Sequence, residues 1–195
     1  MNYFEVFGLE RRLGVDVEAL QQRFYELSRR HHPDFHQAAP AEEQAKALQA
    51  SALLNAAYRT LRDPLARIDY LVRLEEGRET REGADVKPKA PAELLAEMFE
   101  IQEALQEAKR GGLDGAGRAA LAAERDRLRT RQRAEEARLT GTLSAAWDTA
   151  GPAERPSLLA AFKTGLATRA YLRTVIDDLD AALDGQETHV THHRH

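Results

Sequence analysis

His32-Pro33-Asp34 separates two stretches that each show the apolar spacing of an amphipathic helix, and this arrangement limits the possible folds. Pro33 has no backbone N–H and disfavours helical geometry at the residue before it, so the first helix must end there. Two helices joined in this way can pack antiparallel as a hairpin. We therefore expect the tripeptide at the exposed corner of a helical hairpin. Taken alone, the three residues predict only a helix stop and a polar turn.

Four helices are predicted in the first 74 residues. A short apolar helix ends near Gly8, and Asp16 is a suitable N-cap for the second helix. A third helix is expected over residues 41–61, and Asp63-Pro64 opens the fourth, since proline is tolerated in a first helical turn. The residues expected on the buried face of the third helix are Leu48, Leu54, Ala57, Tyr58 and Leu61.

The rest of the chain predicts a second helical domain. Helical patterns cover residues 93–110, 114–150 and 156–183, and the short glycine-bearing connections between them favour a three-helix bundle. The whole chain is thus expected to be all-α. The predicted boundaries are 1–74 for the first domain, 75–90 for a linker rich in charge and proline, 91–184 for the bundle, and 185–195 for a disordered histidine-rich tail.

Composition excludes several classes of function. The chain has no cysteine, which rules out disulfides, cysteine nucleophiles and thiolate metal sites. A formal charge of -4 gives no field suited to nucleic acid. No segment approaches the ~20 apolar residues of a membrane span, and no signal peptide is recognisable at the start. We expect a cytoplasmic protein that binds neither nucleic acid nor membranes.

Two segments carry a resemblance to a known family. Residues 55–71, Asn-Ala-Ala-Tyr-Arg-Thr-Leu-Arg-Asp-Pro-Leu-Ala-Arg-Ile-Asp-Tyr-Leu, together with the His-Pro-Asp corner and the opening Asn2-Tyr3-Phe4, resemble the J domain of the HscB co-chaperones of iron–sulfur cluster assembly. Residues 93–105 resemble the first helix of the HscB C-terminal domain, where such proteins hold the scaffold IscU. The resemblance covers about residues 1–74 strongly and 91–109 moderately.

The resemblance implies a co-chaperone rather than an enzyme, with a four-helix J domain and a C-terminal bundle. It implies that the J domain stimulates the ATPase of an HscA/DnaK-type chaperone, and that the bundle delivers IscU and so aids cluster transfer to apo-proteins. No catalytic residue, metal site or cofactor is implied. The residues expected to face the chaperone ATPase are His32, Pro33, Asp34, Arg23, Arg29 and Arg30. For the three arginines, the alternative interpretation is a solvated helix surface.

The expected scaffold-binding face lies on the helix predicted over residues 93–110. Leu95, Phe99 and Gln102 are spaced i, i+4 and i+7 and therefore share one face. A second apolar stripe, which we assign to the core, consists of Leu94, Met98, Ile101 and Leu105. A buried bundle face is the alternative for the first stripe. With the resemblance, the expected scaffold-binding residues are Leu95, Ala96, Phe99, Glu100, Glu103 and Tyr171.

The sequence departs from the family at three positions. His31 stands where many members have an aromatic residue, and Phe35 where many have a basic one, which puts one peripheral cationic contact in doubt. Ala96 replaces what is often a larger apolar residue. The expected consequence is either weaker scaffold binding or a shift of the contact to Leu95 and Phe99.

Other interpretations of the function remain open. One is a J-domain protein that serves a different client, since the match weakens after residue 110. Another is an enzyme in the C-terminal bundle, which is disfavoured because residues 91–184 contain no histidine. The arginines at alternate positions from Arg125 to Arg133 are read as a solvated helix neutralised by nearby acids. The histidines of the tail are read as adventitious metal ligands.

Overall fold

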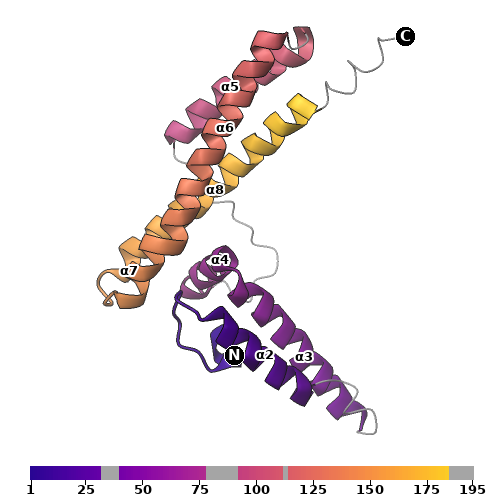
Figure 1. The fold of residues 1–195 in the computed structure, drawn as a ribbon. Helices are drawn as coiled ribbons and strands as arrows, with labels where there is room; N and C mark the ends of the chain where they lie inside the picture. The colour runs from indigo at the N-terminus through magenta and orange to yellow at the C-terminus, as the bar shows by residue number, and fades with distance from the viewer. Residues whose placement is uncertain (32–39, 78–91, 112–113, 185–195) are drawn as a thin grey trace. The chain divides into compact units, whose positions relative to one another are not determined.

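The computed structural model describes residues 1–31, 40–77, 92–111 and 114–184, and every regular element among them is helical (Figure 1). The expected all-α fold is confirmed. The chain divides into two compact units, one drawn from residues 1–84 and 140–159 and the other from residues 85–139 and 160–195. We call them unit 1 and unit 2.

The first four helices of unit 1 begin and end close to the predicted positions. They are α1 (Tyr3–Phe7), α2 (Val17–His31), α3 (Ala41–Arg62) and α4 (Pro64–Glu75). Gly8 ends α1 in the left-handed region, at φ 68°, which glycine adopts without steric cost. The Asp16 carboxylate accepts from the N–H groups of Glu18 and Ala19, so the expected N-cap of α2 is present. The Asp63 carboxylate caps α4 in the same way, by accepting from the N–H of Ala66.

Aromatic pairs hold these helices together. Phe24 of α2 stacks on Tyr58 of α3 with ring centroids 4.2 Å apart. Tyr3 stacks on Tyr70 at 4.3 Å, and its backbone N–H also donates to the Tyr70 hydroxyl over 2.9 Å. Tyr70 therefore joins α4 to α1 by both stacking and a hydrogen bond, with its polar end satisfied in a buried position.

The prediction for one core residue of α3 is wrong. Leu48 is 61% exposed, whereas Ala47 is 6% exposed and lies in the core beside Leu54, Ala57, Tyr58 and Leu61. At 100° per residue, Ala47 lies seven residues before Leu54 and falls within about 20° of it. Leu48, six residues before Leu54, falls about 120° away. Helical geometry therefore outweighs hydrophobicity at this position.

Residues 140–159 belong to unit 1, although the sequence pattern places them in the C-terminal bundle. The helix predicted over 114–150 is helical nearly throughout, but it contains a π-helical turn at Leu139–Leu143 between α6 (Gly115–Arg138) and α7 (Ser144–Thr149). Trp147 of α7 is only 1% exposed. A short helix far along the chain thus completes the core of unit 1.

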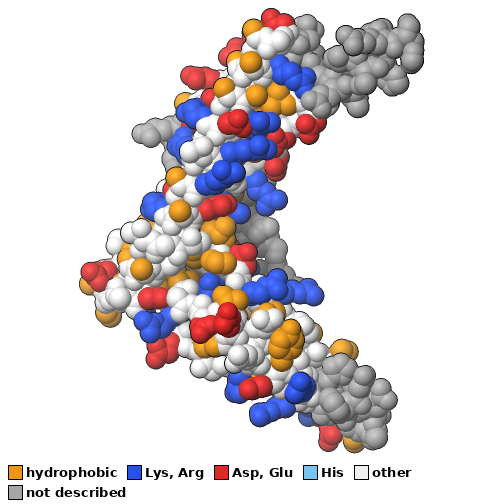
Figure 2. All heavy atoms as spheres, in the orientation of Figure 1, with side chains coloured by type: hydrophobic (Ala, Val, Ile, Leu, Met, Phe, Trp, Pro, Cys, Tyr) orange, Lys and Arg blue, Asp and Glu red, His pale blue; other side chains and the backbone are white. Residues whose placement is uncertain are grey.

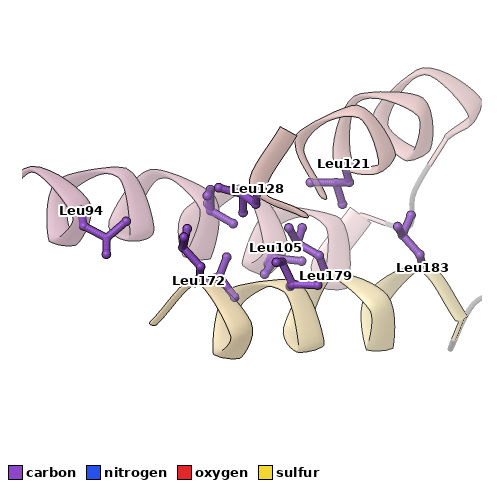
Figure 3. Close-up of a cluster of buried hydrophobic side chains, with 10 residues drawn as sticks. Leu94, Leu105, Leu121, Leu128, Leu172, Leu179 and Leu183 are labelled. Carbon is purple, nitrogen blue, oxygen red and sulfur yellow. The ribbon is translucent and has the colours of Figure 1, made fainter. Parts of the chain in front are cut away.

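Unit 2 is built on α5 (Ala92–Gly111), α6 and α8 (Arg155–Asp184). Their leucine side chains point towards one another in a continuous apolar cluster (Figure 3). The fully buried members include Leu94 of α5, Leu128 of α6 and Leu172 of α8. The three predicted bundle helices therefore pack against each other as expected.

Candidate functional site

The outer face of α2 is cationic. Arg23, Arg29 and Arg30 are all exposed. Arg23 and Arg30 are seven residues apart and share one side of the helix, while Arg29 lies about 100° from Arg30. Arg23 pairs with Glu26 over 3.0 Å, a surface contact of little energetic weight. The face carries charge that an acidic partner can reach.

The His32-Pro33-Asp34 corner lies outside the residues that the structure describes, as does the side chain of His31. α2 is described up to His31 and α3 from Ala41, and the corner belongs to the stretch between them. The roles expected for His32, Pro33 and Asp34 remain predictions.

The helix α5 carries two faces of different character. Leu94, Ile101 and Leu105 are 2%, 8% and 3% exposed and belong to the cluster in Figure 3. Leu95 is 38% exposed and Phe99 is 75% exposed. A large aromatic side chain that remains three-quarters exposed contributes little to the core of unit 2, so this second stripe is available to a partner.

The other expected scaffold-binding residues are placed in two ways. Ala96, Glu100 and Glu103 are exposed on α5 beside Leu95 and Phe99. Tyr171 of α8 is partly buried and packs against the apolar cluster of unit 2. The α5 residues thus form one acidic and apolar surface, while Tyr171 also serves the core.

Glu97 fixes α5 to α6, a role that the sequence does not reveal. Its carboxylate accepts hydrogen bonds from Arg127 and Arg131, at 2.5 and 2.6 Å. Burial raises the pKa of Glu97, but the two arginines outweigh that effect, and the pKa lies below its usual value. Glu97 lies about 200° around the helix from both Leu95 and Phe99, so its ion pairs leave the exposed stripe uncovered.

Four arginines of α6 form ion pairs with other helices, namely Arg125, Arg127, Arg129 and Arg131. Arg125 and Arg129 both contact Asp180 of α8, at 3.5 and 2.7 Å, in addition to the Glu97 pairs. Figure 2 shows basic side chains gathered over α6 with acidic ones beside them. Hydrogen bonds to Glu124 and to Glu97 raise the pKa of Arg127. These four arginines therefore tie α6 to its neighbours rather than forming a free basic stripe.

Neither a metal centre nor a membrane segment is found in the part of the chain that the structure describes. No group of three histidine, cysteine or acidic side chains is arranged to hold a metal ion within the described ranges. None of the described helices is both long and apolar enough to cross a bilayer. The histidine-rich tail, residues 185–195, lies outside the described residues.

Comparison with known families decides the classification. Residues 2–70 match the family model of the DnaJ domain, and residues 90–153 match that of the HSCB C-terminal oligomerisation domain. The chain is an HscB-type J-domain co-chaperone. The DnaJ domain implies an Hsp70-type partner, and the HSCB C-terminal domain implies a scaffold partner. Such co-chaperones serve iron–sulfur cluster assembly and are generally not enzymes.

Two solved HscB structures share this architecture. Chaperone HscB from Vibrio cholerae is 26% identical with a TM-score of 0.61, over 95% of this chain and 99% of that one. The human co-chaperone protein HscB is also 26% identical, with a TM-score of 0.60, over 92% of this chain and 81% of that one. The similarity extends across both halves of the chain, and the HSCB C-terminal model continues to residue 153, well past the point near residue 110 where we expected the match to weaken.

Proposed function

We propose that this HscB-type protein stimulates the ATPase of an HscA/DnaK-type chaperone through its J domain and delivers the scaffold IscU through its C-terminal domain, so that clusters pass to apo-proteins in the cytoplasm. The exposed stripe of Leu95 and Phe99 on α5 carries the proposal. It lies within the segment matched by the HSCB C-terminal model. A helix needs only one apolar stripe to pack, and α5 already buries another.

The chemistry of the stripe fits a protein partner. Leu95 and Phe99 offer apolar area, and Glu100 and Glu103 border it with negative charge. This arrangement suits a partner surface with an apolar centre and basic residues around it, since desolvated apolar anchors supply affinity while rim charges set orientation. The arginines of α2 suit an acidic surface on the chaperone in the same way.

Calorimetric titration of the full chain with apo IscU from the same organism tests scaffold binding. We expect saturable binding with a Kd in the micromolar range, and a loss of about 2 kcal/mol or more in the double variant Leu95→Ala with Phe99→Ala. Leu48→Ala is a matched control, because Leu48 is also exposed but lies on α3. No binding by the folded wild type would exclude IscU and leave a J-domain protein with a different client.

The ATPase activity of the HscA-type chaperone tests the proposed role of the J domain. Wild type is expected to raise steady-state hydrolysis, and His32→Gln to abolish the increase, because the corner residue is expected to contact the ATPase directly. Equal stimulation by the variant and wild type would contradict the proposed role of the corner. Circular dichroism of both proteins controls for folding.

A further inference from the structure

The loop before α2 is held by a residue more than a hundred positions away. The backbone N–H groups of Leu13 and Gly14 both donate to the carboxylate of Asp148, each over 2.7 Å. Hydrogen bonds to an ionised acceptor are stronger than those between neutral groups. One side chain of α7 therefore fixes two consecutive peptide groups of residues 10–15.

The absence of a side chain at Gly14 allows this contact. A Cβ atom at position 14 would lie 2.9 Å from a carboxylate oxygen of Asp148, closer than real Cβ atoms approach. Any side chain at this position would push the carboxylate away from the two N–H groups. The close approach of Asp148 thus depends on glycine here.

A buried cation lies in the same region. Arg67 of α4 is only 4% exposed, and its Nε and Nη1 atoms make no hydrogen bond to any described residue. Burial lowers the pKa of Arg67, and the carboxylates of Asp148 and Asp63 act against that shift. A buried charge is costly without an opposite charge nearby. Asp148 therefore serves both as acceptor for the loop and as counter-charge for α4.

The neighbouring residues keep Asp148 in place. Trp147 is 1% exposed, and the guanidinium of Arg155 lies 5.2 Å from the centre of its ring. Asp148 is thus carried on a helix whose adjacent side chain is anchored in the core of unit 1. A carboxylate on such a rigid support holds its partners in a fixed geometry.

The loop that Asp148 holds leads directly into α2. Asp16 caps the helix, and Leu20, one turn further, is 3% exposed. A groove of about 280 Å³ lies between the loop and the start of α2 and reaches Arg23. The bonds to Asp148 and the burial of Leu13, which is 4% exposed, therefore act together to fix the loop at the base of α2.

We propose that Asp148 is a positioning residue for the chaperone-facing surface of α2. It sets the base of the helix that presents Arg23 and Arg30 and that leads to the His-Pro-Asp corner. Asp148 lies outside the DnaJ match, which ends at residue 70, so the functional J unit of this chain includes part of its second half. This inference rests on the proposed stimulation of a chaperone ATPase.

Two substitutions in the full chain test it. Asp148→Asn keeps the shape but replaces one acceptor oxygen with a donor, and Gly14→Ala displaces the carboxylate without changing it. Their matched controls are Asp177→Asn, exposed on α8, and Gly141→Ala, where an added Cβ meets nothing within 4 Å. Each protein is assayed for amide exchange over residues 9–16 and for stimulation of the HscA-type ATPase over a range of concentrations.

We expect amide exchange at residues 13 and 14 to rise about tenfold in both variants, because each loses a charge-assisted hydrogen bond. The concentration for half-maximal stimulation is expected to rise about three- to tenfold, with little change in the maximum, since orientation rather than chemistry is altered. Both controls should match wild type.

The outcomes separate this inference from the proposed function. Wild type that fails to stimulate any HscA-type ATPase would reject the proposed function itself, whatever the exchange data show. Wild type that stimulates, with both variants equal to it, would overturn the positioning role even if loop exchange rises. If Asp148→Asn does not fold, Gly14→Ala decides the matter.

Discussion

At the scale of single residues, Glu97 connects an internal role to an exposed surface. It lies between Leu95 and Phe99 in the sequence, yet it points to α6 and accepts from Arg127 and Arg131. The spacing of apolar residues on α5 predicts which side faces the core, and the structure agrees. The partners of Glu97 come 30 and 34 residues later on another helix, so periodicity within α5 cannot identify them.

Replacing Glu97 with glutamine tests the strength of this link. Because the carboxylate is 21% exposed and both arginines are more exposed, solvent screens the pairs, and we expect Glu97→Gln to lower the free energy of unfolding by about 1 kcal/mol. In a chain of this size that corresponds to a fall in Tm of about 2–4 °C. Glu100→Gln, an exposed neighbour, is the control. A Tm equal to wild type would show that the pairs add no stability.

The same residue predicts a dependence on pH. The folded-state pKa of Glu97 lies below the ordinary value of 4.5, so the unfolded chain takes up a proton at this residue more readily than the folded chain. Its stabilisation is present above the unfolded-state pKa and is lost as pH falls through the folded-state value. Urea titrations should therefore show the difference between wild type and Glu97→Gln at pH 7 and a smaller difference below about pH 4. A constant difference over this range would contradict the pKa argument.

At the scale of whole helices, bounds are more predictable than interruptions. The third helix was expected over 41–61 and is Ala41–Arg62, and the last was expected over 156–183 and is Arg155–Asp184. Capping residues and prolines mark such ends in the sequence. The π-helical turn at Leu139–Leu143 has no comparable marker, since it lies inside a continuous helical segment and contains no proline.

The crossing of α6 and α8 depends on a glycine. A Cβ atom at Gly165 would lie 2.8 Å from a methyl carbon of Leu139 and 2.5 Å from a carboxylate oxygen of Glu135. Leu139 is fully buried and cannot move freely. Alanine is the better helix former by about 1 kcal/mol, but overpacking typically costs about 1–3 kcal/mol, so we expect Gly165→Ala to destabilise unit 2.

Chemical unfolding of Gly165→Ala, followed by circular dichroism at 222 nm, measures this balance. Gly141→Ala is the control, because a Cβ there meets nothing within 4 Å and the change should be neutral or stabilising. Greater stability in Gly165→Ala than in wild type would mean that the two helices separate easily at this point.

At the scale of the whole molecule, the chain returns to its first unit. Composition marks residues 75–90 as a linker, and from this the sequence predicts two domains in succession. Residues 140–159 instead join unit 1, where Leu13 and Gly14 meet Asp148. Local composition cannot show such a return, because the contacts join residues more than 130 positions apart that carry no shared motif.

The only tryptophan of the chain reports this arrangement. Trp147 is buried among the residues assigned to unit 1, so its fluorescence should follow the unfolding of that unit. Two leucine-to-alanine substitutions distinguish the two units. Leu61→Ala truncates a buried side chain of α3, and Leu128→Ala truncates one of α6. Each should destabilise its own unit by about 3 kcal/mol.

We expect Leu61→Ala to move the fluorescence midpoint in urea by more than Leu128→Ala does, while Leu128→Ala mainly accelerates amide exchange in α5, α6 and α8. The reason is that truncating a core side chain mainly destabilises the cooperative unit that contains it. If Leu128→Ala shifts the fluorescence midpoint as far as Leu61→Ala, then Trp147 unfolds with unit 2. In that case α7 would not form part of the J unit, and Asp148 would have no fixed support from which to hold the loop before α2.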